Sequence, residues 1–142
     1  MMTVHIERLR PGDDLRRSLE AWAKRQDLGA AFVLSAVGSL SPAMLRLAGR
    51  DHPTVIDGDS ELLTLSGTIS AQGVHLHMSV ADADGNVTGG HLLAGSIVRT
   101  TMELVLGIAS GWQIRREIDP VTGFEEMVAE NHDELLGARG PD

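Results

Sequence analysis

Hydrophobic and polar residues alternate along most of this chain with the two-residue period of β-strands. The first such segment, Thr3 to Leu9, sets Val4 and Ile6 against His5 and Glu7, which is the pattern of a half-buried strand. Further strands are predicted over residues 30–38, 43–48, 61–70, 74–80, 91–99, 101–109 and 112–118. Residues 49–59 are polar and contain Pro53 and Gly58, so we expect a surface loop there.

One segment has the period of an α-helix instead. Leu15, Leu19 and Trp22 recur at spacings of three and four residues, with charged residues between them. Two aspartates precede this stripe as an N-cap and first-turn charge, and Gly29 follows as a C-terminal stop. The sequence therefore predicts an α+β fold, a mainly antiparallel β-sheet packed with one main N-terminal helix.

The length of 142 residues suits one domain with a sizeable core. No repeat, low-complexity tract or linker divides the chain. Residues 127–142 are rich in acidic side chains, and we expect a tail there that forms a short strand or helix and then frays.

Composition limits the classes of function. The net charge of −8 argues against direct nucleic-acid binding, which depends on Lys and Arg neutralising phosphates. Because there is no cysteine, disulfides and thiolate sites are excluded, and a metal would need His or carboxylate ligands. The chain has no apolar run long enough to span a membrane and no secretory signal, so we expect a cytoplasmic protein.

The stretch from Gly73 to Gly95, GVHLHMSVADADGNVTGGHLLAG, holds the candidate chemistry. Alternation along a strand puts His75 and His77 on one face, roughly 7 Å apart. A tight turn then allows His91 to return beside them. Three imidazoles on one face would form an open tripod for zinc or another divalent metal.

Two carboxylates are candidates for a fourth ligand or a general base, Glu61 and Glu103, because both fall on predicted strands. An ordinary alternative stays open, in which the histidines form a polar face or a hydrogen-bonded pocket. The sequence contains no phosphate-binding loop, dinucleotide fingerprint, nucleophile elbow or HExxH motif.

The spacing GxHxH, a turn glycine and then GGHLLxG resembles the PPC domain family, which is found in plants and prokaryotes. The segments RLRPGDDLRRSLEAWAKRQDLGAAFVLSAVGSLSPAMLR, SELLTLSGTIS, TMELVLG and DPVTGFEE also resemble this family. The resemblance covers residues 4–126, so we expect a single PPC-like domain over 1–142 with its core at 4–126.

This resemblance implies an α+β domain that forms homotrimers, with His75, His77 and His91 matching the three histidines of the family. In plants the domain follows AT-hooks that grip DNA, but no RGRP-like core occurs here. Contact with DNA would therefore run through protein partners. The fold is also similar to that of acetolactate decarboxylase, a zinc lyase, which is a fold-level likeness only.

Two functions remain in view. One is a homotrimeric binding or assembly module, regulatory in character, with a three-histidine metal or ligand site. The other is a zinc-dependent lyase or hydrolase that acts on a small carbonyl or carboxylate compound. The sequence favours the module, because no complete catalytic set is present.

Overall fold

The structure, a computed structural model, describes residues 1–132 and shows one α-helix and ten β-strands in that part of the chain. The elements are β1 (Met2–Leu9), α1 (Leu15–Arg25), β2 (Ala31–Leu40), β3 (Ala43–Arg46), β4 (Thr54–Ile56), β5 (Ser60–Ser70), β6 (Gly73–Asp82), β7 (Val87–Leu92), β8 (Val98–Ala109), β9 (Trp112–Ile118) and β10 (Glu125–Asn131).

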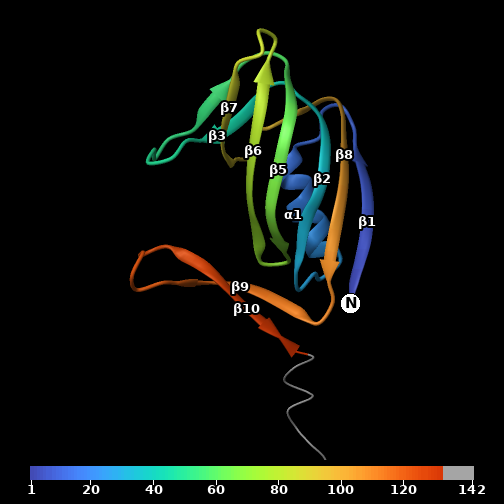
Figure 1. Ribbon diagram of the computed structural model, residues 1–142, viewed down its shortest axis with the longest axis vertical. Coiled ribbons are helices and arrows are strands. Elements are labelled where there is room, and N and C mark those ends of the chain that lie inside the picture. Colours follow the sequence, from blue (N-terminus) through green and yellow to red (C-terminus); the bar gives the residue numbers. More distant parts are fainter. Residues whose placement is uncertain (133–142) are drawn as a thin grey trace, which may run out of the picture.

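Eight strands form one sheet in the order β1-β8-β2-β5-β6-β7-β3-β4, and every pairing is antiparallel. Helix α1 covers one face of this sheet, while β9 and β10 form a separate hairpin that projects from its lower end (Figure 1). The predicted fold class, an antiparallel sheet packed with one helix, is confirmed.

The core lies between α1 and the sheet. Leu15, Leu19 and Trp22 of the helix are buried, as the helical stripe predicts. On β6, Leu76 and Met78 alternate with exposed residues and pack into the same core. Burying each such side chain stabilises the fold by about 1.5–3 kcal/mol.

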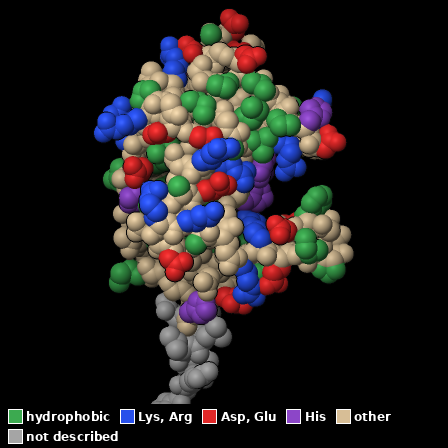
Figure 2. All heavy atoms as spheres, turned by 180° about the vertical axis from the view of Figure 1, so that it is seen from behind, with side chains coloured by type: hydrophobic (Ala, Val, Ile, Leu, Met, Phe, Trp, Pro, Cys, Tyr) green, Lys and Arg blue, Asp and Glu red, His purple; other side chains and the backbone are tan. Residues whose placement is uncertain are grey.

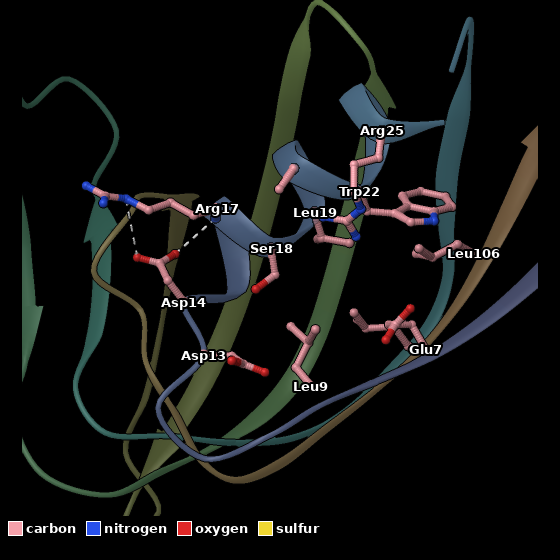
Figure 3. A pocket seen from close by; sticks show the side chains of 12 residues that line it. Glu7, Leu9, Asp13, Asp14, Arg17, Ser18, Leu19, Trp22, Arg25 and Leu106 are labelled. Atoms are coloured by element: carbon pink, nitrogen blue, oxygen red, sulfur yellow. Dashed lines mark hydrogen bonds and ion pairs between the residues drawn. The ribbon is translucent and has the colours of Figure 1, made fainter. Parts of the chain in front are cut away.

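Asp14 fixes the start of α1, as Figure 3 shows. Its Oδ1 accepts a hydrogen bond from the backbone N–H of Arg17 at 3.0 Å. Its Oδ2 accepts another from the N–H of Gly95 at 2.7 Å. One carboxylate thus ties the helix to the loop that follows β7.

Three boundaries differ from expectation. The helix ends at Arg25, before Gly29, because Asp27 turns the chain at a φ of 47°, a conformation that Asp tolerates. The predicted loop at 49–59 contains β4, which pairs with β3. The predicted strand at 91–99 is divided, because the buried hydroxyl of Ser96 bonds to the backbone of Met44 and replaces ladder bonds there.

The start of the acidic tail forms a short strand, one of the two possibilities expected for it. Its first residues belong to β10, which pairs with β9, and residues 133–142 lie outside the described part. Within residues 1–132, the one helix is too short and too polar to cross a membrane.

Candidate metal centre

Strands β6 and β7 bring the three predicted histidines together. Val74, Leu76 and Met78 of β6 face the core, so His75 and His77 share the opposite face. His91 of β7 pairs directly with His77 in the antiparallel ladder. One ring nitrogen from each histidine lies within 4.8 Å of those from the other two.

The spacing of the imidazoles suits a tetrahedral ion. Their ring centroids are 5.0, 5.2 and 5.5 Å apart, and Nε2 of His75 lies 3.2 Å from Nε2 of His77. Two nitrogens that each lie about 2.05 Å from a tetrahedral Zn²⁺ would be about 3.3 Å apart. The residues present therefore fit a divalent metal.

Two glycines allow the strands to approach at this point. Gly67 of β5 adopts a φ of 133°, and a Cβ there would lie 2.0 Å from the carbonyl oxygen of His75. A Cβ on Gly90 would lie 2.7 Å from the carbonyl oxygen of Arg46 on β3. Any larger residue at either position would displace a strand next to a histidine.

Arg16 of α1 reaches the same centre. Its Nη1 donates to the carbonyl oxygen of Leu92 at 2.9 Å and lies 3.3 Å from Nε2 of His91. A guanidinium only donates hydrogen bonds, so Nε2 is the acceptor and the ring proton is on Nδ1. That Nδ1 atom is buried and has no hydrogen-bond partner within residues 1–132.

Two of the histidines, His91 and His75, are held in their neutral form. Burial, followed by the positive charge of Arg46, lowers the pKa of His91 to about 4. Burial and then the charge of Arg116 also lower the pKa of His75. A neutral imidazole keeps a lone pair free at neutral pH, which is the state that a metal ligand needs.

The two predicted carboxylates lie elsewhere. Glu61 pairs with Ala81, four residues beyond His77 on β6, which is about 13 Å along the strand. Glu103 lies on β8, three strands away from β6, or about 14 Å across the sheet. Neither joins the histidine cluster.

A different glutamate lies near the histidines, and sequence reasoning missed it. Glu126 of β10 lines a pocket with His75 and His77, and its negative charge raises the pKa of His75 against the larger lowering effects. Its position depends on how the β9–β10 hairpin folds back under the sheet, for which the sequence has no local signal.

His75 and His91 border a groove of about 840 Å³ between the sheet, α1 and the hairpin. Figure 2 shows histidine side chains in this hollow, with basic and acidic side chains around them. Its charged lining consists of Arg16, Glu20, Lys24, Arg46, Arg116, Glu125 and Glu126. The site thus combines metal-ligand geometry with space for a small molecule.

Several known proteins are similar to this chain in sequence or in fold. The chain is 47% identical over 126 residues to the bifunctional protein GlmU of Synechococcus sp. strain JA-3-3Ab. That alignment covers 89% of this chain but only 20% of the cyanobacterial protein, so the chain spans about a fifth of that relative.

Solved structures agree in fold. A hypothetical protein from Salmonella superposes with a TM-score of 0.89 at 34% identity, over 92% of this chain and 95% of that one. A metal-containing protein from Archaeoglobus fulgidus superposes with a TM-score of 0.78 at 27% identity, over 89% and 93%.

Residues 1–110 match one domain family, and this range contains the whole eight-stranded sheet, α1 and the three histidines. The hairpin of β9 and β10 lies beyond it. The chain belongs to the Plants and Prokaryotes Conserved (PCC) domain family, which is the PPC family that its sequence resembles.

Proposed function

We propose that the chain is a metal-binding assembly module of the PCC family, with His75, His77 and His91 as the ligands of a divalent ion. The 3.2 Å separation of two Nε2 atoms, close to that in a tetrahedral site, carries the proposal. Zinc is the favoured ion, because an all-imidazole site without thiolates suits it.

The module is proposed to assemble as a homotrimer. Apolar side chains on β1, β2 and β5 remain exposed on the face of the sheet away from α1, with Ile6 74%, Val37 61% and Leu63 48% exposed. Several large apolar side chains exposed on one face of a sheet indicate a partner. Protein partners in the cytoplasm fit a chain with a net charge of −8, whereas direct DNA binding does not.

Elemental analysis tests the metal site. Protein purified without an affinity tag should carry about one divalent ion per chain, and the double variant His75→Ala/His77→Ala should carry none. The exposed His52, which lies outside the cluster, provides a matched control as His52→Ala. Failure of the unmodified protein to take up zinc on titration would refute the site.

Light scattering tests the assembly separately. We expect a mass three times the 15.2 kDa of one chain. A monomer at micromolar concentration would contradict the trimer and leave the metal site untouched. A charged substitution in the exposed apolar face, Val37→Asp, should dissociate the assembly.

A second function is favoured by the groove beside the histidines, whose volume of about 840 Å³ suits a small substrate. In this alternative the protein is a zinc-dependent lyase or hydrolase for a small carbonyl or carboxylate compound. A bound zinc would polarise a carbonyl oxygen or acidify a water molecule. Glu126 is the carboxylate placed to exchange a proton in the groove, instead of Glu61 or Glu103.

Turnover assays decide between the two functions. A lyase or hydrolase should convert one of a panel of small keto acids and esters, with loss of activity in Glu126→Gln. A module should show no turnover in the metal-loaded protein.

A further inference from the structure

Three guanidinium groups surround the histidines, each from a different element. Arg16 comes from α1, Arg46 from β3 and Arg116 from β9, and all three line the groove. Arg46 is paired with His91 in the β3–β7 ladder. The groove also contains Glu20, Glu125 and Glu126, so a site for an anion depends on which guanidinium groups these carboxylates leave without an ion pair.

The first of these arginines is fully engaged within the protein. Arg16 forms a 2.8 Å ion pair with Glu20 and donates to the carbonyl oxygen of Leu92 and toward His91. Its role is therefore structural, and its charge is largely balanced by Glu20.

The other two arginines have no acidic partner among the described residues. Arg116 donates one hydrogen bond of 3.2 Å to the hydroxyl of Thr68. Within residues 1–132, neither Arg46 nor Arg116 takes part in an ion pair. Glu126, which lines a pocket with His75 and His77, accepts a hydrogen bond from Thr122 instead.

We propose that Arg46 and Arg116, which flank the histidine centre, recognise a small ligand that carries a carboxylate or phosphate group. A guanidinium matches both groups through two parallel N–H···O bonds. The rest of such a ligand would face the metal-binding histidines. Ile118 and Phe124 of the hairpin line the groove as well and would contact its apolar part.

The hairpin contributes the part of this site that lies outside the range matched by the family. Arg116, Ile118 and Phe124 all lie beyond residues 1–110, the range that matches the family. Arg46 and the histidines lie within it. The identity of the anion is therefore set jointly by the family fold and by the β9–β10 hairpin.

This inference rests on the proposed metal function, and calorimetry can separate the two. Zinc-loaded and metal-free protein would be titrated with malonate, inorganic phosphate and the uncharged malonamide. We expect binding of malonate or of phosphate, which identifies the anionic group, and no binding of malonamide. The zinc content of each sample is measured in parallel.

Substitutions assign the binding to the two arginines. Arg46→Gln and Arg116→Gln should each weaken anion binding at least tenfold, with zinc content unchanged. Arg46→Lys, which keeps the charge but loses the paired N–H groups, should give an intermediate loss. Arg50→Gln removes an exposed charge close by in sequence and should have no effect. Circular dichroism confirms that each variant is folded.

The results that would refute the anion site differ from those that would refute the metal site. Full zinc content with no binding of either anion, or with binding that the two glutamine variants leave unchanged, would overturn the anion site alone. If the protein takes up no zinc, the metal function fails. The anion site is then judged on the metal-free protein, where arginine-dependent binding supports it and absent binding overturns it.

Discussion

The Nη1 atom of Arg16 lies 3.3 Å from Nε2 of His91 and donates toward its lone pair. The guanidinium therefore occupies the lone pair of Nε2, which an ion would need if it bound His91 through that nitrogen. The ion pair with Glu20 and the bond to the carbonyl oxygen of Leu92 keep Arg16 in this place. At the proposed metal site, the helix would thus compete with an ion for this nitrogen.

Removal of this competitor should tighten metal binding. A hydrogen bond from a charged group contributes about 1.5–3 kcal/mol, so Arg16→Gln should raise zinc affinity roughly tenfold. Competition with a chromophoric chelator measures the change. Arg17→Gln, an exposed neighbour on the same helix, should leave the affinity unchanged, and equal or weaker binding by Arg16→Gln would contradict the competition.

Acid should destabilise the metal-free protein through His91. Its pKa is lowered to about 4 in the folded state, whereas the unfolded chain titrates near 6.5. The unfolded state therefore binds more protons as the pH falls from 6.5 to 4, and the free energy of unfolding decreases over that window.

Urea denaturation at pH 7.5, 5.5 and 4.5 in the presence of a chelator measures this dependence. His91→Gln should flatten the curve over that window, and the exposed His52→Gln should keep it. The same decrease in stability in all three proteins would show that His91 is not its source.

Gly67→Ala should destabilise the fold by about 3 kcal/mol, because the new Cβ meets the carbonyl oxygen of His75 at a strained backbone position. It should also lower zinc affinity, since β6 must shift. Thermal melting and zinc titration measure the two effects. Ser66→Ala, an exposed change on the same strand, is the control, and a fully stable Gly67→Ala would rule out the close approach.

Asp14→Ala should cost about 2 kcal/mol of stability. It removes the helix N-cap and leaves the N–H of Gly95 without its acceptor. Chemical denaturation would detect the loss. Asp57→Ala, in an exposed loop, should change stability by less than about 0.5 kcal/mol, and an equally small effect at Asp14 would count against its bridging role.

The sequence predicted the parts of the site that depend on local period. The alternation around His75 and His77, with the turn before His91, placed the three imidazoles correctly on one face. The same patterns predicted α1 and most of the strands, because burial on one side of each element imposes its period.

The remaining site residues depend on how distant segments meet. Glu103 is on a strand as predicted, but the order β8-β2-β5-β6 moves it away from the histidines. The other residues of the groove belong to separate elements: Arg16 to α1, Arg46 to β3 and Glu126 to the hairpin. Strand order and hairpin placement are set by long-range packing, which periodicity does not encode.

The residues of the site lie in two separate parts of the fold, the main sheet and the β9–β10 hairpin. The three histidines sit on strands that also build the core, so changes there threaten folding. The β9–β10 pair lies outside the main sheet, and its groove-facing residues can vary with little effect on the core. Related chains could thus acquire new ligands by exchanging this one hairpin while they retain the same three-histidine scaffold.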